Sequence, residues 1–563
     1  MKKFLILLIL SASFTGCKQW LDVNTDPSNP ADVPMALLLP TVELNAAQSL
    51  SAGKDAGIGQ DLGVYTHQLS TRESANVYEA DGNEYYLDLS WSLMYNTTMQ
   101  NLQKILDKSS SSTSPSPYYS GIAKIIKAYM FSQFVDIYGD IPFSEANKKE
   151  SGILYPKFDK GEAIYPELIK LLDEGIADLK KDKGTVYPGA DDLIFGGKAT
   201  SWIKTANTIK LKLYNQTRLV DNTVGPKITA LLANNAELIG ATSESFMFPY
   251  TSKSSPDERN PAFVETYEAT QKSTHMSPWF FEILRGINPL FSGIRDPRIP
   301  YYFYNQLKSS ETGRDGNPFE YRYGGFTSIY FGSKGPDRDR SQDKSITVYG
   351  IYPCGGRYDQ GDALTVGVKE GTGTGTGSAP YRFLTYTDRL FIEAELISAG
   401  VITGDAKAKF TAALNEAFKQ VDYVVSKVKS AQTVPVIATL PTTATYITKI
   451  LALYDAGDAN KKMEIIMTQK WISSFGSYVD QYTDYRRTGY PVLFDPNNTT
   501  MAPGGFVTPP AGGDPDRTLP PVKVSCSLNY PLSLAWPNEE LNKNPSAPTQ
   551  KTDPSTFKVF WDK

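Results

Sequence analysis

Residues 121–146 of the chain read GIAKIIKAYMFSQFVDIYGDIPFSEA. Four of the apolar residues share one helix face, at positions i, i+3, i+4 and i+7: Ile122, Ile125, Ile126 and Tyr129. Other apolar residues widen this stripe, which predicts a helix buried on more than one side. Gly139 and then Pro142 follow the periodic run. This order predicts the helix end, because glycine adopts a left-handed conformation and proline cannot continue the helix. We therefore expect this helix at the centre of a helical domain.

The composition is that of a globular protein without a basic surface field. The 563 residues are 40% hydrophobic and 21% charged, and 57 basic against 61 acidic residues leave a net charge of −4. Nothing in this balance indicates a nucleic-acid partner. The 34 tyrosines and 26 phenylalanines supply rings that can pack in a core or serve as stacking platforms for a ligand. The length suits an elongated helical array.

Histidine and cysteine are scarce. His67 and His275 are the only histidines, which argues against histidine-dependent zinc sites and catalytic triads. Cys354 and Cys526 could form a disulfide or remain free thiols, and the sequence leaves both open. The segment GGKAT resembles the end of a phosphate-binding loop, but Asp192 stands where that loop needs its first glycine. The sequence predicts no cofactor and no metal site built from side chains, and it leaves open a cation held by backbone carbonyls.

The N-terminus predicts a lipoprotein signal. Residues 1–16 hold two lysines, a short apolar run and small residues, and Cys17 stands at the expected cleavage position. Phe14 occupies a position where the lipoprotein motif prefers leucine. The resemblance implies cleavage before Cys17 and lipid attached there, and an ordinary signal peptide with an incidental cysteine is the alternative. Residues 17–33 then form a tether, and no other segment is apolar enough to span a bilayer.

Helical spacing recurs along much of the rest of the chain. The segments with this spacing are 39–52, 85–107, 160–181, 199–220, 390–397, 405–425, 442–455 and 461–486. Irregular or Gly/Pro-rich composition marks the others: 53–84, 109–117, 241–380 and the tail 492–563. We expect one domain over 34–563, with a helical scaffold at about 34–240 and 381–491. The loop-rich region 241–380 is interpreted as a functional excursion on that scaffold.

The fold class that this pattern predicts is mainly α. Short helices with small and aromatic residues on one face, joined by short turns, are typical of stacked helix pairs of the tetratricopeptide kind. No strict 34-residue period is present, so such repeats are expected to be degenerate.

Four segments together resemble the SusD/RagB family of Bacteroidetes surface lipoproteins. They are FVDIYGDIPFSEA (134–146), DPRIPYYF (296–303), QKWISSFGSYVDQYTDYRRTGYP (469–491) and WPNEELNKNP (536–545). The resemblance implies tetratricopeptide-like helix pairs that support a variable, loop-rich half. It also implies a partner, a SusC-like TonB-dependent outer-membrane transporter, over which the lipoprotein sits as a lid on the cell surface. The implied function is capture of a nutrient for import, most often a glycan and in some members a peptide, without chemistry on the ligand.

Two motifs within these segments are interpreted as structural. Arg486 and Arg487 follow two aspartates near a helix end, and their guanidinium groups could pair with Asp136, Asp140 or Glu145 if the first and third motifs pack together. The alternative is a site for an anionic ligand. The P-x-x-E-x-x-x-N pattern of WPNEELNKNP puts its Glu and Asn one helical turn apart, which favours a fold-stabilising contact.

Ligand contact is expected from aromatic rings in the irregular segments, because sugar faces and peptide side chains pack on flat rings while polar neighbours bind hydroxyls or amides. The candidates are Tyr65, Tyr78, Trp279, Tyr323, Tyr330 and Tyr349, with His67, Asn76 and Arg322 as polar neighbours. Two other functions are weighed. One is a structural surface lipoprotein that contacts the barrel without binding nutrient. The other is a glycoside hydrolase, which needs two suitably spaced carboxylates.

Overall fold

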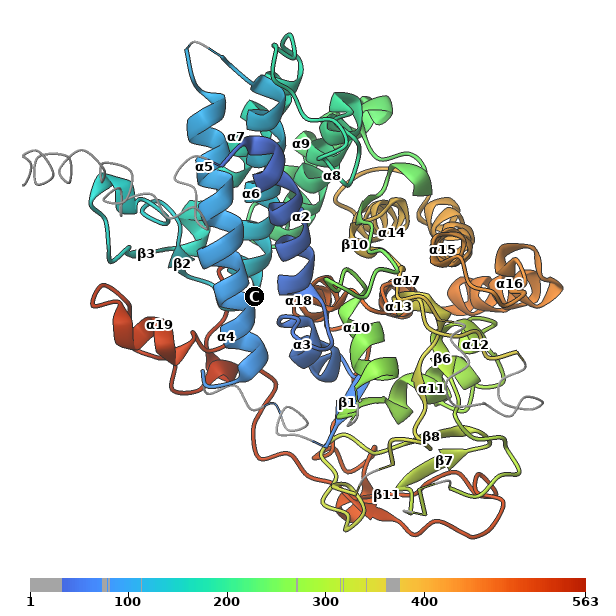
Figure 1. Ribbon diagram of the computed structural model, residues 1–563. Coiled ribbons are helices and arrows are strands. Elements are labelled where there is room, and N and C mark those ends of the chain that lie inside the picture. The colour runs from blue at the N-terminus through green and yellow to red at the C-terminus, as the bar shows by residue number, and fades with distance from the viewer. Residues whose placement is uncertain are drawn as a thin grey trace, which may run out of the picture.

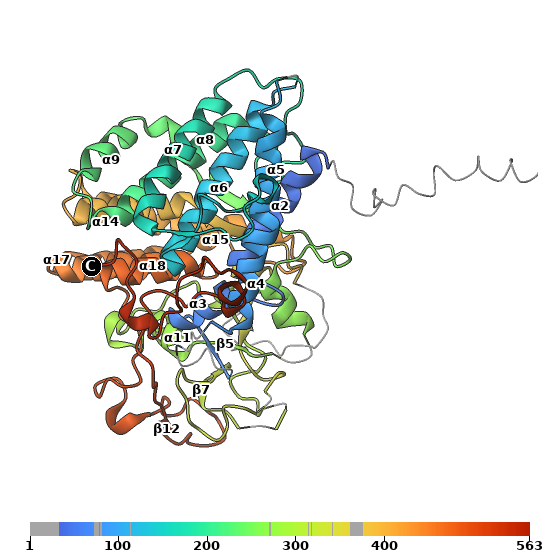
Figure 2. The ribbon, with the colours of Figure 1, turned by 90° about the vertical axis from the view of Figure 1, so that its left-hand side faces the viewer.

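The computed structural model describes residues 33–72, 78, 82–112, 114–269, 272–313, 315–316, 318–340, 342–360 and 375–563. The fold is mainly α-helical, as the sequence predicts. Helices gather at one end of the molecule, and most of the short strands lie at the other end with the loop-rich segments (Figures 1 and 2). The leader 1–16, Cys17 and most of the tether lie outside the described residues.

The scaffold consists of helices that pack on their neighbours in sequence. Its long elements are α2 (Met35–Leu50), α4 (Tyr85–Ser92), the π-helical turn Leu93–Met99, α5 (Gln100–Ser109), α6 (Pro117–Tyr138), α7 (Gly161–Leu179), α8 (Ala199–Thr217), α9 (Val224–Ala233), α14 (Tyr386–Ser398), α15 (Ala406–Val428), α16 (Pro441–Ala456), α17 (Ala459–Ser473) and α18 (Tyr478–Thr488). Helix α6 packs on α7, α14 on α15 and α16 on α17. Such pairs are those expected for degenerate tetratricopeptide-like repeats.

The remaining elements form a second set, whose helices and strands are short. Its helices are α3 (Gly59–Tyr65), α10 (Pro261–Phe263), α11 (Pro278–Arg285), α12 (Ile299–Tyr302), α13 (Ile351–Cys354) and α19 (Asn538–Lys543). The strands are β1 (Leu69–Thr71), β2 (Ile141–Pro142), β3 (Phe158–Asp159), β4 (Phe246–Phe248), β5 (Thr274–Met276), β6 (Phe303–Tyr304), β7 (Tyr321–Tyr323), β8 (Phe326–Ser328), β9 (Val348–Tyr349), β10 (Tyr381–Leu384), β11 (Phe506–Val507) and β12 (Val522–Lys523). Each pairs antiparallel with one other strand: β1 with β5, β2 with β3, β4 with β10, β6 with β9, β7 with β8, and β11 with β12.

Helix α6 is the central buried element that its sequence predicts. Almost every residue from Gly121 to Tyr138 is buried, and the helix contacts α5, α7, α8 and α18. It ends at Gly139, whose φ is +80° with ψ at −106°, a combination that side chains disfavour. Trp561, close to the C-terminus, is fully buried beside it and donates a hydrogen bond from Nε1 to Asp136 Oδ1 at 2.8 Å. The end of the chain is thereby joined to the central helix.

Three segments differ from the sequence-based expectation. The run 461–486 is two helices, α17 and α18, with a turn at Ser474–Ser477. Gly476 in this turn has φ +91°, and a Cβ there would lie 2.6 Å from Pro353. Hydrophobic periodicity continues across the turn because both helices pack against the same hydrophobic core. The segments 53–84 and 241–380 also contain some of the short helices and strands given above. Strand β1 of the first segment pairs with the distant β5 of the second, whereas β7 and β8 are close in sequence and pair with each other.

Arg487 anchors a buried ion-pair network. Its guanidinium contacts Glu395 of α14 at 2.9 Å and Asp484 at 2.6 Å, and Arg218 contacts the same Glu395 at 2.9 Å. Lys470 pairs with Asp484 at 2.7 Å. Burial by itself would raise the pKa of Glu395, but the two arginines lower it to about 2. The structural interpretation of this arginine is supported, although its partners are not the three carboxylates that the sequence suggested.

Arg486 connects the first and third motifs through the backbone. Its guanidinium donates hydrogen bonds to the carbonyl oxygens of Asp136 and Leu532. The same group lies 3.9 Å from the ring of Tyr482 and 4.8 Å from that of Trp561. The two motifs therefore pack together, which was the condition for such a contact, but the arginine binds the carbonyl of Asp136 and not its carboxylate. In the fourth motif, Asn544 donates to Glu540 at 2.9 Å and to Pro156 O at 2.8 Å.

The two cysteines in the described part of the chain are buried and are not joined to each other by a disulfide. The Cys354 thiol donates to Gly350 O at 3.5 Å, and burial raises the pKa of this thiol well above its usual range. The Cys526 thiol lies 3.2 Å from Leu528 O. The alternative of a disulfide between them, which the sequence left open, is therefore excluded.

Candidate functional site

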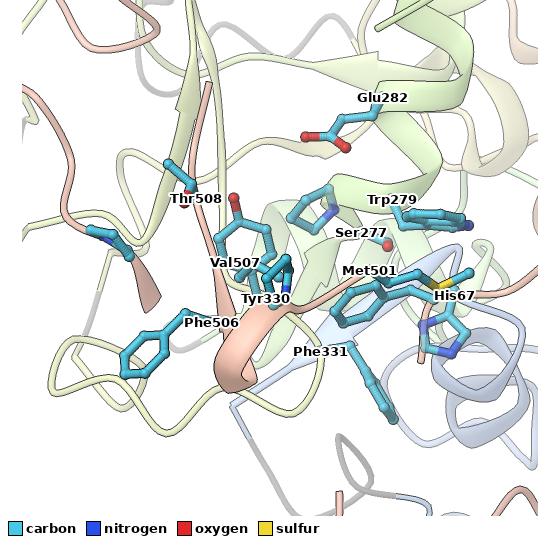
Figure 3. Close-up of a pocket in the computed structure, with 14 residues that line it drawn as sticks. His67, Ser277, Trp279, Glu282, Tyr330, Phe331, Met501, Phe506, Val507 and Thr508 are labelled. Atoms are coloured by element: carbon cyan, nitrogen blue, oxygen red, sulfur yellow. The ribbon is translucent and has the colours of Figure 1, made fainter. Parts of the chain in front are cut away.

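A cavity of about 700 Å³ opens where the loop-rich region meets the C-terminal tail (Figure 3). We call it the aromatic pocket. Its lining residues are His67, Ser277, Pro278, Trp279, Glu282, Tyr330, Phe331, Phe494, Met501, Pro503, Phe506, Val507, Thr508 and Pro521. They come from the turn after α3, the first half of α11, the segment after β8 and the tail around β11. The tail is held against the loop-rich region by the bridge between Ser333 and Val524 and by the Gly324 N–H bond to Gly513 O.

Helix α11 presents two of the functional groups of the pocket. Proline at its first position and Gly286 just beyond its end, at φ +75°, delimit this short helix. Trp279 and Glu282 are three residues apart and so lie on one face, toward the pocket. The buried residues Phe280, Phe281 and Leu284 occupy other faces and hold the helix in the core.

Aromatic rings form the walls. Trp279 is half-buried; its Nε1 donates to Val492 O at 3.1 Å, and its ring lies 5.8 Å from that of Phe494. Phe506 is 44% exposed and lies across the cavity from Trp279 (Figure 3). Tyr330 is buried and lies between them in this view. Half-exposed rings of this kind can stack against the apolar face of a ligand.

His67 is a neutral polar group at the base of the pocket. Its Nε2 shares a hydrogen bond with the Tyr78 hydroxyl at 2.7 Å, and its ring meets that of Phe331 edge-on at 4.5 Å. Burial lowers the pKa of His67 to about 3, so the ring carries no charge near neutral pH. Its backbone has φ +56°, a strained conformation for a side-chain-bearing residue. The ring is fully buried and its Nε2 is engaged by Tyr78, so in this structure it supports the base of the pocket.

Glu282 carries the one carboxyl group among the described lining residues. Burial raises its pKa to about 7, and an opposing contact with the Tyr321 hydroxyl lowers it. Near neutral pH this group therefore exchanges between a carboxylate, which only accepts hydrogen bonds, and an acid, which also donates one.

Several of the residues that the sequence predicts as ligand contacts meet at this pocket. Trp279, His67 and Tyr330 line it. Tyr78 lies directly behind, with its ring 4.7 Å from that of Phe331, and Tyr65 packs edge-on to Tyr78 at 5.6 Å. Trp279 and Tyr330 reach the pocket surface, whereas the fully buried His67 and the two tyrosines behind it support the wall.

The remaining predicted contacts lie elsewhere. Arg322 is fully buried; its Nε donates to Gly324 O at 3.0 Å and its Nη1 lies 3.8 Å from Asp514. Tyr349 is also buried, and its hydroxyl is 2.8 Å from that of Tyr478. Tyr323 is half-buried, and the guanidinium of Arg285 lies over its ring, 5.3 Å from the ring centroid. In this structure these three residues hold the scaffold and do not line the pocket. Asn76 lies outside the described residues.

Other lining residues carry weak signals or none in the sequence. The stretch around Glu282, PWFFEILR, begins with proline and is followed by glycine, which could have indicated a short helix with Trp279 and Glu282 on one face. Phe494 and Phe506 belong to the Gly/Pro-rich tail, where no periodicity assigns them to a face. Their place in the pocket follows from long-range packing.

A second hollow of about 690 Å³ lies between α4, α5, the segment after β2 and α19. Its walls are mainly charged and amide side chains, among them Gln100, Lys104, Asp107, Lys148 and Lys543. The aromatic pocket is the stronger candidate because rings line it on several sides and few charges compete with a ligand. Within the described ranges, no helix is long and apolar enough to cross a membrane.

Comparison with known proteins identifies the family. The model of a SusD-like family, described as "Starch-binding associating with outer membrane", matches residues 27–508, which is most of the chain. The protein belongs to the SusD-like family. This is a family of binding proteins associated with the outer membrane, so the resemblance found in the four sequence segments is confirmed. No curated protein sequence matches the chain.

Solved structures show the same fold in SusD-like proteins. A SusD homologue from Bacteroides fragilis is 18% identical with a TM-score of 0.66, and the match covers 94% of this chain and 100% of the homologue. A SusD/RagB family protein from Bacteroides thetaiotaomicron is 18% identical with a TM-score of 0.63, covering 92% and 95%. A SusD homologue from Flavobacterium johnsoniae, described as chitin-binding, is 18% identical with a TM-score of 0.62, covering 94% and 98%.

Proposed function

We propose that this protein binds a glycan in the aromatic pocket at the cell surface and passes it to a SusC-like TonB-dependent outer-membrane transporter. The observation that carries the proposal is the pocket itself, in which half-exposed rings of Trp279 and Phe506 stand on opposite sides of a cavity of about 700 Å³. A sugar ring has an apolar face of C–H groups that stacks on such rings, and its hydroxyls need polar partners. Glu282 and Thr508 supply these partners.

The pocket chemistry favours binding without turnover. Glycoside hydrolysis needs two carboxyl groups on either side of the scissile bond. Glu282 is the one carboxyl among the described residues that line the pocket. His67 stays neutral near pH 7 because burial lowers its pKa to about 3, which makes it a weak base. The residues present therefore suit recognition of an intact glycan.

Delivery to a transporter rests on the family and on the N-terminus. The family is associated with the outer membrane. A lipid at Cys17 would anchor the chain there through the tether 17–33. The helical scaffold would then face the barrel or the cell exterior while the aromatic pocket holds the cargo.

Calorimetry on the lipid-free protein (residues 18–563) tests the binding step, with neutral oligosaccharides and with peptides of similar size. We expect a neutral oligosaccharide to bind, and Phe506→Ala to weaken it by roughly tenfold through loss of a stacking ring. Leu528→Ala removes a similarly exposed apolar side chain that does not line the pocket, and should leave the affinity unchanged. Binding of peptides alone, or hydrolysis of the bound glycan, would overturn the proposal.

The transfer step has a separate test. Affinity purification of the full-length protein from its native membrane should recover a large TonB-dependent barrel. Cells that lack that barrel should bind the glycan at the surface but fail to import it. Recovery of the protein without any barrel partner would refute the role in import and leave the binding step as a separate question, decided by the calorimetry.

A further inference from the structure

The aromatic pocket has an unusual balance of charge. Its described lining residues include one carboxyl group, that of Glu282, and no lysine or arginine. The other ionisable side chains are His67, which burial keeps neutral, and Tyr330, whose hydroxyl has its pKa raised by burial and by the nearby Glu282 carboxylate. A ligand in this pocket therefore meets at most one charge, and that charge is negative.

The groups around Glu282 do not compensate this charge. The Tyr321 hydroxyl of β7 and the Tyr330 hydroxyl after β8 face it, and both are neutral at physiological pH. Glu320, just before β7, is acidic as well and accepts a hydrogen bond from Ser333 at 2.6 Å. The tail side of the pocket contributes apolar residues and the Thr508 hydroxyl, without an ionisable group among its described lining residues.

The nearest arginine on the same helix is engaged outside the pocket. Arg285 lies one turn beyond Glu282, and its guanidinium sits 5.3 Å from the centroid of the Tyr323 ring. It does not line the cavity. A carboxylate or sulfate on a sugar would thus enter a half-buried site that holds a like charge and offers no cation, and such a contact is unfavourable. A sugar hydroxyl, in contrast, can donate a hydrogen bond to Glu282.

We propose that the aromatic pocket selects uncharged glycans over acidic ones, and that Glu282 is the residue that determines this selectivity. This inference rests on the proposed glycan-binding function and names the class of glycan. Glu282 acts on a charged substituent directly, by repulsion across the pocket, and acts on a neutral sugar as a hydrogen-bond partner.

The selectivity should depend on pH. Burial raises the pKa of Glu282 to about 7, so the group is charged above this value and neutral below it. Sugar carboxylates titrate near the α-carboxyl range of about 3.5 and stay ionised throughout pH 5.5–8. His67 does not change its charge in this interval. Rejection of an acidic glycan is therefore strong at pH 8 and weakens as the pH falls through 7.

The experiment compares a panel of neutral hexose and pentose oligosaccharides with uronate-bearing oligosaccharides of equal length. Affinities are measured by calorimetry at pH 5.5, 7 and 8 for the wild type and Glu282→Gln. The control is Glu162→Gln on the exposed surface of α7, which makes the same charge change away from the pocket. The measured quantity is the affinity for the acidic oligosaccharide divided by the affinity for the neutral one. A variant that weakens the binding of both equally leaves this ratio unchanged.

For the wild type we expect this ratio to rise at least tenfold between pH 8 and pH 5.5. In Glu282→Gln it should be at least tenfold above the wild-type value at pH 8 and nearly independent of pH, while Glu162→Gln should follow the wild type. A pH-independent ratio in the wild type, which needs no variant to observe, would overturn the inference, and so would an unchanged ratio in Glu282→Gln. Both results leave neutral glycan binding intact. A wild type that binds no glycan of the panel would instead overturn the proposed function, and this inference with it.

Discussion

Removal of the Glu395 carboxylate should destabilise the protein strongly. This group is fully buried where three distant segments meet, and both its oxygens are engaged. Arg487 of α18 and Arg218 after α8 each contact it at 2.9 Å, and Asn215 donates to it at 3.1 Å. In Glu395→Gln the side chain keeps its shape, but the two guanidinium groups lose the charge that compensates them. Breaking a buried ion pair in this way costs about 3–5 kcal/mol.

The lowered pKa of Glu395 gives a similar value for the free energy that its carboxylate contributes to stability. Its pKa is about 2 in the folded protein against 4.5 for the unfolded chain. At about 1.4 kcal/mol per pKa unit, the ionised form contributes about 3 kcal/mol. Because the folded pKa is the lower one, this stability is fully present above pH 4.5 and is lost as the pH falls from 4.5 toward 2. The glutamine variant should lack this part of the acid dependence.

Urea denaturation followed by tryptophan fluorescence measures the effect, with the midpoint and slope compared at pH 7 and at pH 4. The matched control is Glu539→Gln, which removes a carboxylate from an exposed pair with Lys543 and should change the free energy of unfolding by less than 0.5 kcal/mol. If Glu395→Gln costs less than about 1 kcal/mol at pH 7, the buried network does not carry the stability that we assign to it.

Three further outcomes are expected. Gly139→Ala should lower the free energy of unfolding by about 1–3 kcal/mol through backbone strain alone, because the φ of Gly139 is +80° while an added Cβ meets no atom within 4 Å. The control is Gly189→Ala, a position that is equally open but has no positive φ, and this change should cost almost nothing. Equal costs in the two variants would contradict the strain argument. Trp279→Ala should weaken glycan binding by roughly tenfold in calorimetry. The control is Tyr85→Ala, which removes an exposed ring outside the pocket and should leave the affinity unchanged. Equal affinities in the two variants would refute the stacking role of Trp279. Cys17→Ala should release the protein from the membrane fraction, and unchanged membrane association would show that lipid at this residue is not the anchor.

The scaffold was largely predictable because its signals are local. Helix α6 ends at Gly139, as the Gly-then-Pro order indicates, and α7 and α8 begin within a residue of the segments that show helical spacing. Periodicity failed where two buried helices share one core, as at the turn through Gly476, because the apolar pattern continues while the backbone changes direction. It also failed for α3, a short helix whose polar residues Gln60 and Asp61 are buried together with its apolar ones.

The candidate site was predictable only in part. Residue type and an irregular setting favoured Trp279, His67 and Tyr330, which line the aromatic pocket, but the same criterion selected Arg322 and Tyr349, which are buried in the scaffold. Composition cannot separate these cases. A tyrosine in an irregular segment is as suitable for a core as for a pocket wall, and only its neighbours decide which it becomes.

The sequence by itself determined that this is a helical protein of the SusD-like family, because caps, periodicity and family motifs are encoded over short stretches of chain. The tertiary structure alone decided which residues form the aromatic pocket. The pocket joins His67, α11, Tyr330 and the tail near Phe506, and strand pairing and packing between these remote segments bring them together. The charge partners of Glu395 and the elevated pKa of Glu282 likewise depend on which distant groups exclude water from them. No short stretch of sequence contains that information.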